Sequence, residues 1–230
     1  MDCHTVVFSA KRTNPGKYNH NELVSLIWSV LSRSKLGAER VQEMHDQYVP
    51  SPFTWSFSEM SPQEVVISWC AYPDDIIGAF TDALKSIEGR ALTVPGSNYL
   101  IKDVYEAEDM QYLPKRLSLH SLSGILVNRR KGDTKKIQPL WYDDDNAEWI
   151  KRVESKLMNK VKLYGDSTVE HHAVISNVKM TGSDKVTYNG VTFTQPLYSL
   201  KLEADPDTMK VALFAGLGQN TGMCAGHVVP

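Results

Sequence analysis

Hydrophobic positions along this chain occur either in runs of β-forming residues or at helical spacing, and the changes from one pattern to the other predict the order of strands and helices. Runs rich in β-branched and aromatic residues predict strands, whereas apolar residues three and four positions apart, as at Leu23, Ile27 and Val30, predict helices. In the first half these patterns predict a strand at 5–11, a helix at 18–34, a short helix at 36–45, strands at 53–57 and 65–70, a helix at 73–87 and a strand at 99–105. Without the short extra helix, the order is the β-α-β-β-α-β of a ferredoxin-like unit.

The second half repeats this order without any repeat of the residues themselves. Its patterns predict a strand at 119–127, a helix at 145–162, strands at 170–180 and 197–203, a helix at 205–214 and a strand at 223–229. We therefore expect an α+β protein built of two tandem ferredoxin-like (RRM-like) domains. The polar run before Pro114 interrupts both patterns and places the boundary there, which gives domains 1–112 and 113–230.

Composition narrows the class of protein. Of 230 residues, 42% are hydrophobic and 23% charged, which predicts a packed core and excludes a disordered, collagenous or coiled-coil chain. No apolar run approaches the roughly 20 residues of a membrane helix, and the N-terminus lacks the layout of a signal peptide. We expect a cytoplasmic protein without a membrane partner. Three cysteines without a C-x-x-C pair favour reduced thiols over disulfides or a cysteine-rich zinc site.

Charge is distributed unevenly. The net charge is -2, but residues 115–162 hold twelve basic against six acidic residues, which is +6 and leaves -8 for the rest of the chain. Such asymmetry is what a phosphate-binding face on an acidic body produces, although a basic run is also found on an ordinary solvated helix.

Residues 216–226 (GLGQNTGMCAG) form a glycine cluster. A dinucleotide-binding turn would require a further helix and strand and an acidic residue about 20 positions later, and only twelve residues follow Gly218. Two interpretations remain open. The cluster is either a backbone nest that holds phosphate or a tight turn between the last helix and the last strand.

The seven histidines offer no metal-ligand spacing, and the adjacent His171 and His172 are expected on opposite faces of a strand. We expect no metal. The chain also contains no P-loop and no G-x-S-x-G elbow. His45 differs in position, because it ends a predicted helix before a Pro-containing loop and should be half-buried. A histidine there can serve proton transfer or act as a partner of the helix dipole.

Five stretches, in order, resemble the CRISPR-associated endoribonucleases of the Cas-six type, which cut repeat RNA into guide RNAs. They are YNHNELVSLIWSVL at 18–31, MHDQYVPSPFTWSFS at 44–58, LSGILVNRRKGD at 122–133, DDDNAEWIKRVESKLMNKV at 143–161 and GLGQNTGMCAGHVV at 216–229. The resemblance spans nearly the whole chain, and it implies the same fold as the patterns above, two ferredoxin-like domains.

The resemblance implies a cut in which a ribose 2′-hydroxyl attacks the neighbouring phosphate without a metal or other cofactor, and it assigns His45 as the proton-transfer catalyst. Some family members carry a tyrosine where this chain has Trp28 and a lysine where it has Ser51. An indole cannot accept a proton and a hydroxyl cannot neutralise phosphorane charge. Another cation must therefore substitute, and Lys35, Arg33 and Arg40 are the nearest in sequence. Trp28 and Ser51 are kept as candidate supporting residues because they occupy the family's tyrosine and lysine positions.

The implied partner is CRISPR repeat RNA, read as a hairpin or a flanking single strand, with other Cas proteins as further partners of an effector complex. Candidate RNA contacts are Arg129, Arg130, Lys131, Lys135, Lys136, Lys151, Arg152, Lys156, Gly216, Gly218, Gln219 and Asn220. Trp28 lies on an apolar helix face, so a core position is expected before base stacking. Two alternatives remain: an RNA-binding module that has lost catalysis, or a structural subunit that caps a guide RNA. The oligomeric state stays open.

Overall fold

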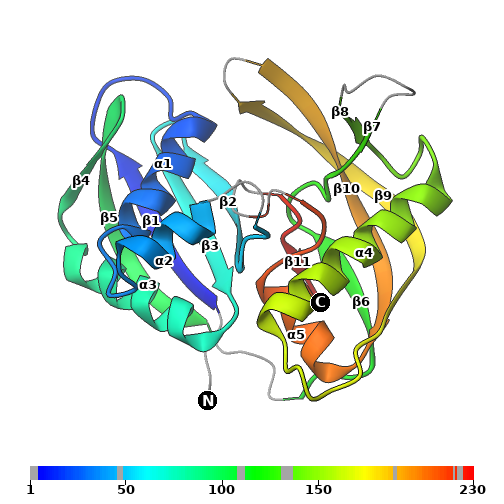
Figure 1. The fold of residues 1–230 in the computed structure, drawn as a ribbon. Coiled ribbons are helices and arrows are strands. Elements are labelled where there is room, and N and C mark those ends of the chain that lie inside the picture. Colours follow the sequence, from blue (N-terminus) through cyan, green and yellow to red (C-terminus); the bar gives the residue numbers. More distant parts are fainter. Residues whose placement is uncertain are drawn as a thin grey trace.

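The computed structural model describes residues 5–45, 49–107, 112–130, 137–188, 191–219, 221 and 225–230. Two antiparallel sheets stand next to each other, and α1, α3 and α4 lie on the same side of them (Figure 1). The C-terminal segment, red in Figure 1, runs between the two units. Among the described residues, no helix is both long and apolar enough to span a membrane.

The first unit contains a five-stranded sheet in the order β2-β3-β1-β5-β4. Its elements are β1 (Thr5–Arg12), α1 (His20–Leu31), α2 (Ala38–His45), β2 (Phe53–Ser61), β3 (Glu64–Ala71), α3 (Asp74–Ile87), β4 (Ala91–Val94) and β5 (Ser97–Ala107). Without α2 and the short edge strand β4, this is the ferredoxin-like β-α-β-β-α-β arrangement.

The second unit has the same arrangement, with the sheet order β11-β6-β10-β9. Its elements are β6 (Arg116–Ser121), β7 (Val127–Arg130), β8 (Ile137–Leu140), α4 (Asn146–Tyr164), β9 (Ala173–Tyr188), β10 (Val191–Ala204), α5 (Pro206–Phe214) and β11 (Val228–Val229). The hairpin β7–β8 forms a separate two-stranded sheet. The predicted fold class, two tandem ferredoxin-like units, is confirmed.

Local sequence signals explain the helix starts and the two cores. The side chains of Asn19, Asp145 and Asp205 accept hydrogen bonds from backbone N–H groups in the first turns of α1, α4 and α5. Each unit buries its own cluster of apolar residues, which includes Trp55 and Trp69 in the first and Trp149 and Tyr198 in the second. Strand alternation and helix amphipathicity therefore point each element inward as the pattern predicts.

The structure differs from the predicted elements at several points. The expected strand 119–127 is wrong in its middle, because β6 ends at 121, β7 begins at 127, and the backbone N–H of Gly124 bonds instead to the Gln195 side chain at 3.2 Å. Of the expected strand 223–229, residues 223 and 224 lie outside the described residues, and among the rest only Val228–Val229 form a strand. The hairpin β4–β5 was not predicted, since β4 has only four residues before the turn at Pro95 and Gly96.

The C-terminal segment of the second unit packs on the outer face of β2 and β3. Thr54 donates a hydrogen bond to the Ala225 carbonyl at 3.2 Å. The buried ring of His227 lies 2.8 Å from the Ser56 hydroxyl and 3.4 Å from the Cys70 sulfur. Burial lowers the pKa of His227 to about 4, so the imidazole is neutral at physiological pH. These contacts join the two units through buried polar groups.

Candidate functional site

His45 is the last residue of α2, and its imidazole is exposed rather than half-buried as predicted. The reason is that α2 is a polar helix in which, of its eight described residues, only Met44 is buried. The imidazole meets the indole of Trp28 on α1, with ring centroids 4.6 Å apart at 62°. Trp28 in turn contacts Phe53 of β2 at 5.4 Å and 71°. His45 therefore has a packed ring on one side and solvent on the other.

A surface cavity of about 500 Å³ runs along α1 beside this ring pair. It is lined by Val24, Ser25, Trp28, Ser29, Ser32, Arg33, His45 and Pro95. Trp28 is thus half-buried at the rim of the core and faces a cavity, which corrects the expected core position. Among the described lining residues none is acidic, so the cavity can accept an anionic group beside the imidazole.

The structure separates the candidates for catalytic support. Arg33 lines the cavity together with His45. Lys35 is directed to α3, where its Nζ lies 3.0 Å from Asp82. Arg40 pairs with Glu43 within α2 at 3.2 Å. Ser51 precedes β2 and, like Lys35 and Arg40, is not among the residues that line the cavity. Arg33 is therefore the candidate cation that the fold brings to His45.

Part of the basic segment forms a cluster where β7 meets α4. Arg152 donates to the Glu148 carboxylate at 2.8 and 2.6 Å and to the Asn128 carbonyl at 2.9 Å. Arg129 lies 3.8 Å from the same carboxylate, so one negative charge faces two guanidinium groups. The side-chain oxygen of Gln219 accepts from the Asn128 backbone N–H at 2.8 Å and brings the glycine cluster to this point.

The other predicted RNA contacts have different positions. Lys151 is exposed on α4, and Lys156 is half-buried one turn after Arg152. The backbone of Arg130 belongs to β7, but its side chain is not described. Lys131, Lys135, Lys136 and Asn220 lie outside the described residues.

Three glycines of the C-terminal cluster, Gly216, Gly218 and Gly226, are buried. Gly216 and Gly218 have φ of +77° and +78°, a region that L residues with a side chain rarely adopt. A Cβ at Gly216 would lie 2.9 Å from Thr54, and one at Gly218 would lie 2.5 Å from the Leu126 carbonyl. Both glycines therefore have a packing requirement that holds whether or not RNA is present.

Lys160 is a buried residue that the sequence analysis overlooked. Its ammonium donates to the carbonyls of Ala215 and Gly216 at 2.5 and 2.9 Å and to the Thr221 hydroxyl at 3.0 Å. The three acceptors pair with the three ammonium protons. They lie at the C-terminal end of α5, where the helix dipole favours a positive charge. Burial lowers the pKa of Lys160 to about 7. The sequence spacing could have predicted this burial, because Lys160 falls on the apolar face of α4 together with Val153 and Leu157.

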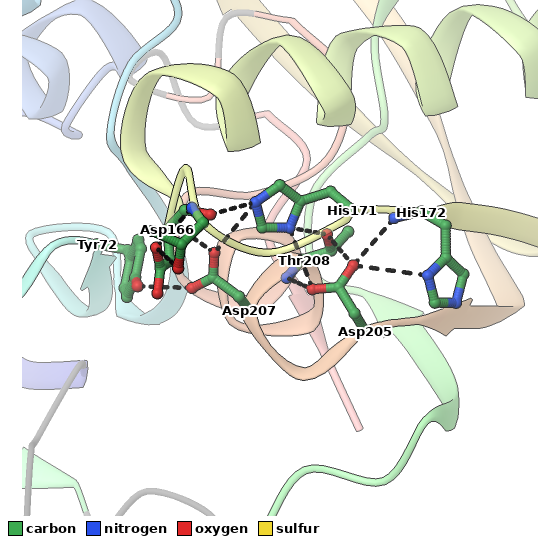
Figure 2. A network of polar contacts seen from close by, with 8 residues as sticks. Tyr72, Asp166, His171, His172, Asp205, Asp207 and Thr208 are labelled. Carbon is green, nitrogen blue, oxygen red and sulfur yellow. Dashed lines mark hydrogen bonds and ion pairs between the residues drawn. The ribbon is translucent and has the colours of Figure 1, made fainter.

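The adjacent histidines do not lie on opposite strand faces as predicted. Figure 2 shows that both turn toward Asp205, which caps α5. His171 Nδ1 lies 3.3 Å from Asp205, its Nε2 lies 2.8 Å from the Asp166 carbonyl, and His172 Nδ1 lies 3.8 Å from Asp205. The prediction failed because residues 171 and 172 precede β9 and lack strand geometry.

The same network reaches the first unit, because the Tyr72 hydroxyl donates to Asp207 at 2.8 Å (Figure 2). Desolvation lowers the pKa of His171, but acceptors at both ring nitrogens and the charges of Asp205 and Asp207 outweigh it and raise the pKa overall. The described residues contain no group of three or more histidine, cysteine, aspartate or glutamate side chains suited to a metal ion. We interpret this network as a structural link between the units.

The structure thus defines a protein of two tandem ferredoxin-like units, with a glycine-rich segment packed between them and a histidine at a cavity of the first. The family model described as "CRISPR associated protein Cas6, C-terminal" matches residues 108–229. The chain therefore belongs to the Cas6 family, and the resemblance seen in the sequence is confirmed.

Solved structures share the fold over almost the whole chain. A Cas6-related protein from Pyrococcus furiosus has 15% sequence identity and a TM-score of 0.73, with 99% of this chain and 98% of that chain covered. A RAMP protein described as binding different RNA substrates has 15% identity and a TM-score of 0.74, with 98% of each chain covered. A Cas6 product complex has 16% identity and a TM-score of 0.66, with 99% of each covered. No curated protein matches the chain.

Proposed function

We propose that this protein is an endoribonuclease that cuts CRISPR repeat RNA into guide RNAs. Membership of the Cas6 family supports this proposal, and structurally similar proteins include a Cas6 product complex. The observation that carries it is the exposed imidazole of His45, which faces solvent at a cavity that also holds Trp28 and Arg33. An imidazole titrates near neutral pH and can move a proton at the pH of the cell.

In the proposed reaction the 2′-hydroxyl of one ribose attacks the adjacent phosphorus. The new O2′–P bond closes a 2′,3′-cyclic phosphate on the upstream fragment, and the broken P–O5′ bond leaves a 5′-hydroxyl downstream. The proton lost by the 2′-hydroxyl or gained by the leaving oxygen passes through His45. Arg33 offsets the charge that develops on the phosphate oxygens, a role that neither Trp28 nor Ser51 can perform.

The RNA backbone is proposed to reach the second unit at the cluster where β7 meets α4. Arg129 and Arg152 present guanidinium groups there, and Lys151 and Lys156 extend the positive surface along α4. Guanidinium groups suit phosphate because they offer paired donors in a fixed plane. Gln219 adds a polar side chain from the glycine cluster, and Arg130, Lys131, Lys135 and Lys136 belong to the same proposed face by sequence.

Replacement of Arg129 by Ala should weaken RNA binding and lower the slope of log affinity against log salt by about one unit, because one phosphate contact and its released counterion are lost. The slope is measured by titrating labelled repeat RNA at several salt concentrations. Arg116→Ala is the matched control, since Arg116 is exposed on β6 and pairs with Glu203. An unchanged slope in Arg129→Ala would remove this residue from the proposed face.

The experiment that tests the function is incubation of repeat RNA with the purified protein in EDTA. We expect a single cut, an upstream product that ends in a 2′,3′-cyclic phosphate and a downstream product with a 5′-hydroxyl, since the nucleophile belongs to the substrate. Mass spectrometry of the fragments identifies both ends. Cleavage that needs added magnesium would contradict the mechanism.

A second candidate function, an RNA-binding subunit without turnover, is favoured by the cavity itself. Trp28 stands there as a ring that cannot exchange a proton, and Arg33 is the one lysine or arginine among the described lining residues. In that case the protein would bind repeat RNA and return it uncut in the same assay, and other Cas proteins would be its partners.

A further inference from the structure

The exposed side of α1 carries an uncommon combination of groups within the cavity beside His45. Ser25, Ser29 and Ser32 recur at positions i, i+4 and i+7, so their hydroxyls lie along one face of the helix. Ser32 bonds to the Trp28 carbonyl at 2.8 Å, whereas the hydroxyls of Ser25 and Ser29 bond to no other described residue. Two hydroxyls are therefore available to a ligand, each as both donor and acceptor.

Trp28 supplies an aromatic surface beside these serines. Its ring is fixed by contacts with His45 and Phe53, yet the side chain remains partly exposed and lines the cavity. Pro95, from the turn between β4 and β5, forms another part of the lining. A ring held in this way loses little side-chain freedom when a planar group stacks on it.

The charged groups that line the cavity favour an anionic ligand. Arg33 contributes a cation at the same cavity, and among the described lining residues there is no carboxylate to compete with an anion. A volume of about 500 Å³ lies in the range of pockets that hold small ligands. A flat aromatic group, hydroxyl partners and a guanidinium together match a nucleotide, which joins a planar base to a phosphate.

We propose that the cavity along α1 binds one unpaired nucleotide of the RNA, with its base on Trp28, its edge at Ser25 and Ser29, and its phosphate toward Arg33 and His45. This inference rests on the proposed function, because it makes the bound nucleotide a neighbour of the cut phosphate. The base must be unpaired, since a stacked position against the indole requires it to leave its own helix.

The test uses 2-aminopurine, whose fluorescence falls when it stacks on an aromatic ring. Repeat RNAs carry it at one position each, and a 2′-deoxyribose at the cut site removes the nucleophile so that binding is observed without chemistry. We expect strong quenching by the wild-type protein at one position beside the cut site. In Trp28→Ala the quenching at that position should vanish, with a loss of roughly 5- to 150-fold in affinity, the change that corresponds to stacking one base.

Ser29→Leu is a second variant that tests the cavity independently, in case Trp28→Ala does not fold. Leucine is a good helix former, and at position 29 it places a larger apolar side chain in the cavity while Trp28 itself is kept, so it should also remove the quenching. Ser86→Leu makes the same change on an exposed turn of α3 outside the cavity and should leave the signal unchanged. Equal quenching in Trp28→Ala and wild type, or quenching at no position, would overturn the proposal.

The outcome is separable from that of the proposed function. If the protein cuts repeat RNA but quenches the fluorescence of no base, the proposed function stands and the proposed nucleotide site is wrong. Quenching that depends on Trp28 without any cutting of an all-ribose RNA retains the site and leaves a binding protein.

Discussion

His45→Ala should lose cleavage of repeat RNA by about 10²- to 10⁴-fold, the range that general acid–base help contributes, and should keep most of its RNA affinity. The imidazole is neither buried nor part of a hydrogen bond within the described residues, so its removal leaves the fold intact. A single side chain of this kind also adds little to an interface that phosphate contacts dominate. Single-turnover cleavage rates and filter-binding titrations measure the two quantities separately.

His120→Ala is the matched control. His120 is exposed on β6, where it pairs in register with Ser199 of β10, and it belongs to no proposed site. Its variant should cut at the wild-type rate. Full activity in His45→Ala would remove the proposed catalyst, and a parallel fall in affinity and rate would make His45 a binding residue.

Elements that depend on neighbouring residues were predictable, and those that depend on distant contacts were not. β1 was predictable because residues 5–11 are rich in β-forming residues, and the structure buries Val6, Phe8 and Ala10 of this strand completely. The break after β6 was not, because it depends on Gln195, which lies 71 residues from Gly124 in sequence and bonds to its backbone. Long-range partners of this kind leave no local signal.

Some features of the candidate site were likewise predictable, and others depend on the folded structure. The importance of His45 came from the family resemblance, but its exposure depends on how little of α2 the core buries. Arg33 and Lys35 are two residues apart, and no local pattern distinguishes them. The structure does, because Lys35 pairs with Asp82 on α3 while Arg33 lines the cavity. Lys160 was overlooked since a lysine on an apolar helix face ordinarily extends to solvent.

Gly218→Ala should destabilise the protein by about 3 kcal/mol or more, whereas Gly37→Ala should cost only about 1–2 kcal/mol, the strain of a left-handed conformation. The two glycines have nearly the same φ, +78° and +83°. At Gly37 a Cβ would meet no atom within 4 Å, but at Gly218 it would lie 2.5 Å from the Leu126 carbonyl. That carbonyl accepts the Gln219 N–H at 2.7 Å, so the methyl group must also disturb a buried hydrogen bond.

Urea denaturation of the two variants and the wild type measures the difference, since a shift of midpoint at constant slope is a change of stability. RNA affinity, measured where all three proteins are folded, then decides between the two interpretations of the glycine cluster. If glycine is needed for packing, Gly218→Ala loses stability, and its folded fraction binds RNA as the wild type does. Stability equal to that of Gly37→Ala combined with a loss of RNA affinity would instead mean that the backbone at Gly218 approaches the RNA, as a phosphate nest requires.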